Sequence, residues 1–165
     1  MQTHFYTTDP AEKRARLDQG YRDETDSSAS MFVFSRPVLH VGIRTTPLYR
    51  LRHRRTGDQI YTVDRAEATQ LLGRARYIDE VRLDSLWVFR ASSPKSAPPD
   101  AVALYRLWNR RARAHFYTRD RAEADHAVAE LGYRIVPQQA YVLKSPALAE
   151  GITAVRLHRL VTGDD

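Results

Sequence analysis

The chain has no cysteine, which excludes disulfide bonds and thiolate metal sites and makes the cell interior and exterior equally acceptable on redox grounds. It also has no apolar run close to the roughly 18 residues that a membrane-spanning helix needs. A glycine-rich phosphate loop, a Gly-x-Ser-x-Gly nucleophile elbow and an HExxH motif are missing too. The chain therefore lacks the common sequence signatures of nucleotide-binding proteins, serine hydrolases and zinc proteases.

The composition is otherwise that of a folded, basic protein. Its 165 residues, 42% of them hydrophobic, predict a single domain, residues 1–165. The formal net charge is +6, and nearly all of the 26 basic residues are arginines. Such a surface attracts anionic polymers without specificity. Alternatively, the arginines are ordinary surface charges whose stems cover apolar side chains.

No basic and apolar leader precedes the first recognisable motif, so no signal peptide is visible. From the sequence as it stands we expect a cytoplasmic protein, or a secreted one if a leader has been removed. Composition does not choose between these two locations.

A four-residue motif, His-Phe-Tyr-Thr, occurs three times and organises the rest of the chain. It stands at residues 4–7 and 115–118, and a diverged copy, Gln-Ile-Tyr-Thr, stands at residues 59–62. The three motif tyrosines lie 55 and 56 residues apart. This spacing indicates three copies of one supersecondary unit that together bury a shared core.

A helix is predicted after each motif. Each copy continues with an aspartate followed by an Ala-Glu pair, at residues 9–12, 64–67 and 120–123. This pattern indicates a capping box, in which the aspartate accepts hydrogen bonds from the first amides and the glutamate reaches back to the cap. A buried stripe at helical spacing is expected at Ala68, Leu71, Leu72 and Ala75, and at Ala124, Ala127, Val128 and Leu131.

Strands are predicted on both sides of each motif and its helix. Residues rich in aromatic and β-branched side chains indicate closing strands at 31–34, 86–89 and 140–143. Opening strands with the sequence Leu-Tyr-Arg-Leu precede the second and third motifs, at 48–51 and 104–107. Residues 38–43 are a candidate for one further strand.

The opening strand of the first repeat is expected at the other end of the chain. Residues 154–158 match the opening strands, and Thr-Gly-Asp at 162–164 matches Thr-Gly-Asp at 56–58. The C-terminal strand is therefore predicted to pair with Phe5 and its neighbours and to close a ring of repeats.

The predicted fold class is β-rich α+β, a pseudo-threefold closed ring of three strand-strand-helix-strand repeats. We favour a β-trefoil-like body with inserted helices over a small toroid of three sheets. Repeat 1 comprises residues 1–37 and the strand 152–165, repeat 2 residues 46–94, and repeat 3 residues 102–146.

These features together resemble a known repeat. The Tyr-Arg-Leu strand, Gly-Asp turn, His-Phe-Tyr-Thr motif, Ala-Glu helix, Gly-Tyr pair and aromatic closing strand are similar to the HFYT-type tandem repeat of unknown function (DUF5648-like). The resemblance covers nearly the whole chain and implies a bacterial secreted or cell-surface protein, with an accessory role in binding glycan. The Glu-Gly pair that this family usually carries after the helix is absent here.

Side chains alternate across the motif strand, so phenylalanine and threonine share one face and histidine and tyrosine the other. We assign the phenylalanine face to the core. The opposite face then lines a surface or groove with the candidate ligand-binding residues His4, Tyr6, Tyr61, His115 and Tyr117. Alternatively, each tyrosine packs edge-on, with its hydroxyl hydrogen-bonded to a neighbouring repeat. Glutamine replaces this histidine in repeat 2, which excludes a symmetric three-histidine metal site.

A second recurring candidate is the arginine in the middle of each opening strand, Arg50, Arg106 and Arg156. This guanidinium either binds a ligand or forms a structural ion pair with Asp58, Asp164 or a helix-cap aspartate. In repeat 3, arginine and alanine replace the Gly-Asp of the turn, so a site that depends on this acid is lost there.

Trp108 and Asn109, directly after the opening strand of repeat 3, are the most specific candidates for glycan binding. Aromatic side chains provide faces on which sugars stack, and nearby polar groups fix the orientation of the sugar. Tyr49, Tyr61 and Tyr117 are further candidate platforms. Alternatively, Trp108 is a wedge packed between repeats.

The sequence favours a non-catalytic, lectin-like module that binds glycan or cell-wall polysaccharide through related sites on its repeats, without metal or cofactor. One alternative is a cytoplasmic nucleic-acid- or protein-binding scaffold that uses the arginines to hold an anionic polymer. Another is an enzyme with one specialised repeat.

Overall fold

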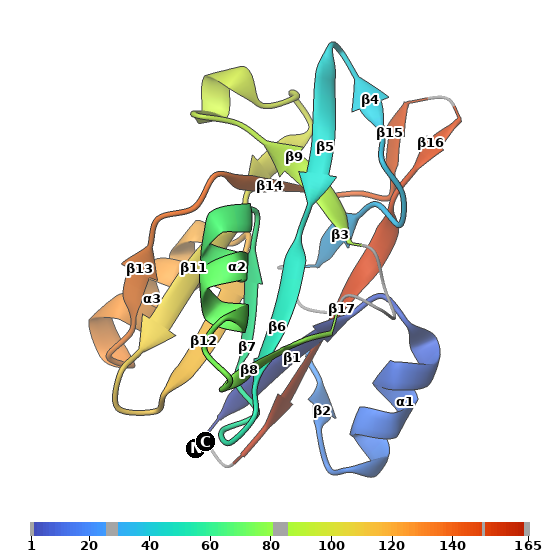
Figure 1. Ribbon diagram of the computed structural model, residues 1–165. Helices are drawn as coiled ribbons and strands as arrows, with labels where there is room; N and C mark the ends of the chain where they lie inside the picture. The colour runs from blue at the N-terminus through green and yellow to red at the C-terminus, as the bar shows by residue number, and fades with distance from the viewer. Residues whose placement is uncertain (1, 26–29, 81–85, 150, 164–165) are drawn as a thin grey trace.

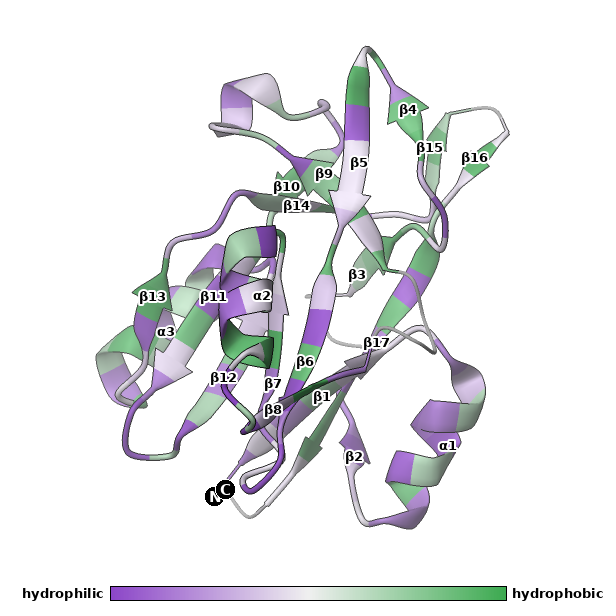
Figure 2. Cartoon of the chain, viewed as in Figure 1, coloured by the Kyte–Doolittle hydropathy of each residue, from purple (hydrophilic) through white to green (hydrophobic). Residues whose placement is uncertain are grey.

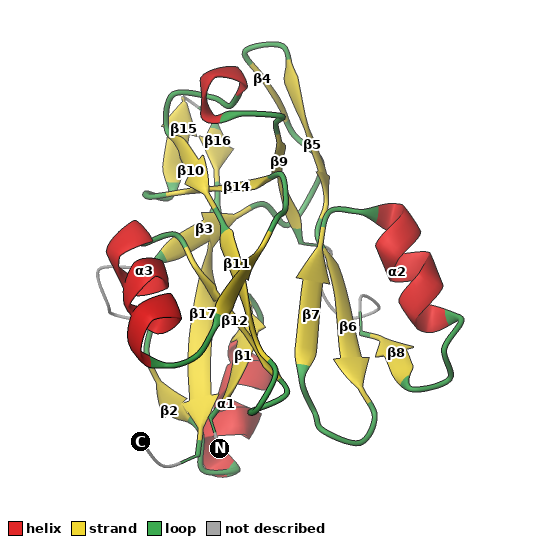
Figure 3. Ribbon diagram, turned by 90° about the vertical axis from the view of Figure 1, so that its left-hand side faces the viewer, coloured by secondary structure: helices red, strands yellow, loops and turns green. Residues whose placement is uncertain are grey.

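The computed structural model describes residues 2–25, 30–80, 86–149 and 151–163. Within these ranges the chain is β-rich, with several sheets and three α-helices set apart from one another at the periphery (Figure 1; Figure 3). No helix there has the length and apolar character needed to cross a bilayer. The prediction of a β-rich α+β chain is therefore confirmed.

Repeat 1 and the segment that follows it contain β1 (Thr3–Thr7), α1 (Pro10–Asp18), β2 (Arg22–Asp23), β3 (Met31–Val33), β4 (Leu39–His40) and β5 (Ile43–Pro47). Repeat 2 and the linker after it contain β6 (Tyr49–His53), β7 (Gln59–Thr62), α2 (Arg65–Leu72), β8 (Tyr77–Asp79), β9 (Trp87–Arg90), a short 3-10 helix (Pro94–Ser96) and β10 (Ala101–Ala103). Every predicted strand is present to within a few residues, and the candidate at 38–43 is the start of the β4–β5 hairpin.

Repeat 3 and the C-terminal segment contain β11 (Tyr105–Asn109), β12 (Ala114–Thr118), α3 (Arg121–Glu130), β13 (Arg134–Val136), β14 (Ala140–Leu143), β15 (Ala147–Ala149), β16 (Ile152–Thr153) and β17 (Val155–Thr162). The last strand, β17, pairs antiparallel with β1, with Phe5 opposite Leu160 and Thr3 opposite Thr162. The predicted pairing of the two ends of the chain is therefore confirmed (Figure 1).

Each repeat contributes the same trio of strands. The motif strand pairs with the opening strand, and the strand after the helix pairs with the other edge of that opening strand, giving the orders β1-β17-β2, β7-β6-β8 and β12-β11-β13. The closing strands β3, β14 and β9 are neighbours in a larger sheet that also takes in the trio of repeat 1. None of the sheets formed by the described residues closes into a barrel, so the β-trefoil-like ring stays a prediction.

The helices begin as predicted, but their glutamates do not complete a capping box. Asp9, Asp64 and Asp120 accept hydrogen bonds from the amides of the first helical turn. The glutamate that follows each cap contacts an arginine of the next repeat instead, as at Glu12 and Glu67. That alternative is stronger because both partners are charged, whereas a capping box pairs the glutamate with a neutral backbone amide.

The buried stripes of the helices are narrower than predicted. Ala68 and Leu71 of α2, and Ala124 and Ala127 of α3, are buried. The flanking residues Leu72, Ala75, Val128 and Leu131 are exposed. The helices α2 and α3 therefore each cover only a small satellite cluster over their own strands, separate from the central core.

The central core lies where the three repeats meet. It combines the three motif tyrosines with aliphatic side chains from every repeat, including Leu48, Leu104 and Leu157. The predicted division of the motif strand into an inner and an outer face is wrong, because Phe5 and Tyr6 are both buried. One side of the strand packs toward the helix of its own repeat and the other toward the neighbouring repeats.

Candidate functional site

The three motif tyrosines form a closed set of contacts in the interior. Tyr6, Tyr61 and Tyr117 are at most 2% exposed, and their rings pack edge to face with centroids 5.3–5.6 Å apart. Each hydroxyl accepts a hydrogen bond from the backbone amide of the tyrosine in the preceding repeat: Tyr61 from Tyr6 (3.2 Å), Tyr117 from Tyr61 (2.8 Å) and Tyr6 from Tyr117 (2.8 Å). This is the edge-on packing expected as the alternative to ligand binding, and burial raises the pKa of each hydroxyl.

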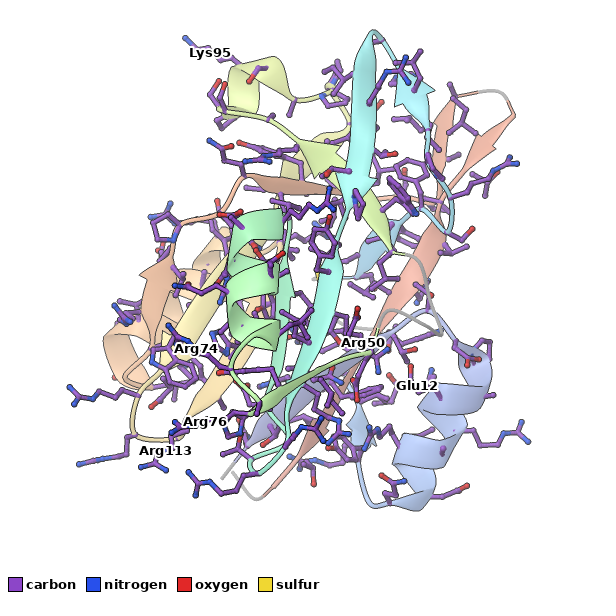
Figure 4. All side chains as sticks on the ribbon, in the orientation of Figure 1. Glu12, Arg50, Arg74, Arg76, Lys95 and Arg113 are labelled. Carbon is purple, nitrogen blue, oxygen red and sulfur yellow. The ribbon has the colours of Figure 1, made fainter. Side chains whose placement is uncertain are left out.

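Buried arginines form a second set of contacts between the same repeats. Arg50 donates to Glu12 (2.9 Å), and Arg106 donates to Glu67 (2.9 Å), in each case across a repeat junction. Burial alone would raise the pKa of Glu12, but hydrogen bonds from Arg50 and Thr7 outweigh it and hold that pKa below its usual value. These arginines are therefore committed to structural ion pairs, with partners other than the predicted aspartates. Figure 4 shows one of these pairs, Arg50 and Glu12.

The equivalent arginine of repeat 1 is Arg159, so the sequence match to Arg156 is wrong by three residues. Arg159 lies opposite Tyr6, as Arg50 lies opposite Tyr61, and it donates to Glu123 (3.0 Å). Arg156 is exposed and lies 5.4 Å from the Phe32 ring. Both arginines are followed by leucine, which is why the sequence alone allowed either alignment.

His4 is buried in a position that keeps it neutral. Its Nε2 lies 3.7 Å from a Glu24 oxygen, but burial and the nearby Arg159 guanidinium lower the pKa of His4 to about 3. Burial outweighs this contact, because 3.7 Å is too long for a hydrogen bond. His4 is therefore placed as an interior group.

His115 joins several of the other predicted site residues. Its backbone amide and its Nδ1 each lie 2.7 Å from a carboxylate oxygen of Asp58, which is 4% exposed. On its other side, His115 Nε2 lies 3.4 Å from Arg106, and its ring packs against Trp108 with the centroids 4.5 Å apart and the ring planes tilted by 40°. Asp58 and His115 thus fix the position of Trp108 at the junction of repeats 2 and 3.

Trp108 lines a groove of about 340 Å³ at this junction. One wall comes from the β6–β7 hairpin, together with Arg76 and Tyr77 at the start of β8, and the β11–β12 hairpin of repeat 3 forms the other. The full lining is His53, Arg55, Thr56, Asp58, Arg76, Tyr77, Trp108, Arg110 and Arg113. The groove therefore combines two aromatic side chains, one histidine and four arginines.

Arg76 and Arg113 lie at the same end of the molecule as Arg74, far from Lys95 (Figure 4). The loops that carry these groups are hydrophilic (Figure 2). Burial, reinforced by the positive charges of Arg55, Arg76 and Arg113, lowers the pKa of His53 and favours its neutral form. The groove therefore presents fixed positive charge beside an uncharged imidazole.

The sequence interpretation missed these arginines as site residues. Their signal was visible as short basic clusters at residues 52–55, 74–76 and 110–113. Each cluster is shorter than five consecutive like charges, and only the fold shows that all three belong to one end of the molecule.

The remaining candidates lie outside the groove or outside the described residues. Asn109 donates to the Leu131 carbonyl (2.8 Å) and accepts from the Ala112 amide (2.9 Å), so its amide holds the β11–β12 turn. Tyr49 packs over the satellite cluster of repeat 2. Asp164 lies outside the described residues. Among those that are described, no group of three or more histidine, aspartate or glutamate side chains is placed to hold a metal ion.

The family model for a domain of unknown function, DUF5648, matches residues 1–143. The chain belongs to the DUF5648 family. The resemblance noted in the sequence is thereby confirmed, although β17, which carries Arg159, lies beyond the matched residues. No curated protein and no solved structure matches the chain.

Proposed function

We propose that the chain is a non-catalytic, lectin-like module that binds carbohydrate in the groove between repeats 2 and 3. The observation that carries this proposal is the position of Trp108, a partly exposed indole held by His115 in a groove that Tyr77 and His53 also line. An aromatic face supplies the stacking surface for a sugar ring, and the polar groups around it supply the orienting hydrogen bonds.

The repeats support one principal site rather than three. The position of Trp108 opposite His115 corresponds to Arg52 opposite Gln59 in repeat 2, and to Val161 opposite His4 in repeat 1. Neither arginine nor valine provides a comparable stacking face. We therefore place the carbohydrate site at a single junction.

Tryptophan fluorescence tests this proposal directly. In a Trp87→Phe background Trp108 is the only tryptophan, so a saccharide that stacks on it changes the emission in a saturable way. We expect binding within a panel of neutral and acidic oligosaccharides and its loss in Trp108→Ala, followed by calorimetry in the otherwise unchanged chain. An absence of binding across the panel, or full binding by Trp108→Ala, would contradict the proposal.

Nucleic acid is a second candidate ligand, because the arginines around the groove belong to the residue type that pairs best with phosphates. Binding of this kind falls steeply with salt concentration. A labelled oligothymidylate, titrated at two salt concentrations, measures it. Weak binding that does not depend on salt would remove this candidate.

We also propose that the three repeats form a pseudo-threefold ring. The tyrosine contacts and the Arg-Glu pairs that recur at all three junctions support this arrangement. A circular permutant that begins at residue 42, in the exposed turn between β4 and β5, with the two original ends joined by a flexible linker, should then fold cooperatively. Failure of several linker lengths to give a folded chain would argue against the ring.

A further inference from the structure

We propose that the groove selects an acidic saccharide, whose carboxylate, sulfate or phosphate group is held by arginines including Arg76 and Arg113 while the sugar ring lies on Trp108. This inference rests on the proposed carbohydrate-binding function and adds the chemical class of the ligand. It assigns a binding role to arginines that are placed together only by the fold.

The arginines converge on the groove from three separate segments. Arg55 lies in the β6–β7 hairpin, Arg76 precedes β8, and Arg110 and Arg113 lie in the β11–β12 hairpin. All four are exposed. The structure gives their side chains no hydrogen bond or ion pair with any other described residue, in contrast to the buried Arg50.

The groove contains little negative charge to offset these arginines. Asp58 is the one carboxylate among its described lining residues, and both of its oxygens are engaged by His115. The guanidinium groups are therefore available for an anion from solution. A planar guanidinium forms paired hydrogen bonds with carboxylate and phosphate oxygens, which makes arginine well suited to an acidic group on a sugar.

The backbone at Arg113 provides independent support. Arg113 has φ +52°, in the left-handed region that only glycine adopts without strain. The equivalent residue of the repeat 2 hairpin is Gly57, with φ +75°. A side chain kept in a strained conformation on the wall of a groove points to a function for that side chain.

Two neighbouring groups suit the rest of a sugar. His53 is held in its neutral form, and its Nδ1 accepts a hydrogen bond from the Thr56 amide at 3.2 Å, so its Nε2 carries the proton and can donate to a sugar hydroxyl. Trp108 lines the same groove as these arginines, and its ring packs against His115. Stacking and anion recognition thus occur in one groove, which favours an acidic saccharide over an inorganic anion alone.

The test compares three tetrasaccharides by calorimetry: sulfated heparin-derived, carboxylate-only oligogalacturonate, and neutral chitotetraose. The two acidic probes distinguish sulfate from carboxylate as the preferred group. We expect the original protein to bind at least one acidic probe about tenfold more tightly than the neutral one. The variant Arg113→Gly should lose most of that preference and bind the neutral probe unchanged.

A matched control separates this site from general charge. Arg44→Gln, an exposed arginine of β5 outside the groove lining, removes the same unit of charge and should change the affinity for the acidic probes less than about twofold. Arg113→Lys retains the charge without the planar fork and should lie between the original protein and Arg113→Gly. Thermal unfolding of each variant checks that it is folded.

The outcomes distinguish this inference from the proposed function. Equal binding of acidic and neutral probes, or full acidic preference in Arg113→Gly, would overturn the inference and leave carbohydrate binding intact. Binding of no tetrasaccharide by the folded protein would overturn both. An oligothymidylate that binds as tightly as the best acidic probe, with the same dependence on Arg113, would identify nucleic acid as the ligand and overturn the saccharide assignment.

Discussion

The three repeats are alike where they meet in the interior and unlike at the hairpin ends that face solvent. Inside, each junction repeats two contacts, a tyrosine hydroxyl on the backbone of the preceding repeat and an arginine on its glutamate. At the hairpin ends, repeat 2 has Gly57-Asp58 where repeat 3 has Arg113-Ala114. Uniform contacts specify how the repeats assemble, whereas the hairpin ends differ, and it is at one of these ends that we propose the single site.

Breaking one interior ion pair should have the largest effect. Arg50→Met keeps the apolar stem but leaves Glu12 without its guanidinium partner, so we expect a loss of about 3 kcal/mol in the free energy of unfolding. This is the lower end of the range for a broken buried pair, because Glu12 retains some contact with water. Urea denaturation measures the change.

The neighbouring exposed Arg54 provides the control, since Arg54→Met should change the free energy of unfolding by less than about 0.5 kcal/mol. A similar loss in the two variants would show that Arg50 has no special structural role.

Removing a tyrosine hydroxyl should have the next largest effect. Tyr61→Phe leaves the Tyr6 amide without its acceptor and the Tyr6 carbonyl without its donor, which should cost about 1–2 kcal/mol. Tyr6→Phe and Tyr117→Phe should each cost a similar amount if the three junctions are equivalent. Thermal and urea unfolding of the three variants, with the partly exposed Tyr21→Phe as control, measure this, and a cost confined to one junction would contradict equivalence.

The repeated elements of the fold could be predicted because they are local. A cap aspartate, an alternating strand and a 55-residue spacing leave direct marks in the sequence, and the pairing of β1 with β17 followed from the missing opening strand. The register of β17 could not be predicted, because Arg156 and Arg159 are both followed by leucine and only packing around Tyr6 selects Arg159.

Some residues of the candidate groove could be named from the sequence. Trp108 was singled out by its residue type and Asp58 by the recurring Thr-Gly-Asp turn, and both line the groove. The role of the helix glutamates was missed because Glu12 and Arg50 are 38 residues apart and meet only across a junction. The arginines of the groove were missed for the same reason, since convergence of separate loops has no local signature.

Acid should destabilise the protein through His4, and repeat 2 suggests the variant that removes this effect. The folded-state pKa of His4 is about 3, below its usual value of 6.5. Between these two pH values the imidazole of His4 is protonated in the unfolded chain and neutral in the folded chain. Stability is therefore lost as pH falls from about 6.5 toward 3, by about 1–2 kcal/mol between pH 7 and pH 5.

His4→Gln should remove that loss, because a glutamine side chain does not titrate. Repeat 2 already has glutamine at this position, where Gln59 donates to Glu80 at 2.9 Å. Urea denaturation at pH 7 and pH 5 measures the slope, and the exposed His126→Gln is the control that should leave it unchanged. An identical slope in His4→Gln and the original protein would show that His4 is not the group responsible.

The smallest expected effect concerns the hairpin ends themselves, and it has the opposite sign. Arg113→Gly places in repeat 3 the residue that repeat 2 uses at this left-handed position, and it should raise the free energy of unfolding by about 0.5–1 kcal/mol. Gly57→Ala should lower it by about 1 kcal/mol for the same reason. Arg111→Gly, on the same loop but without a positive φ, should be mildly destabilising, because glycine there only adds freedom to the unfolded chain.

A urea midpoint that rises in Arg113→Gly while acidic-saccharide binding falls would show that repeat 3 retains an arginine at the expense of stability. An unchanged or lower midpoint would mean that contacts of Arg113 offset the strain, and its backbone would then no longer support a role in binding.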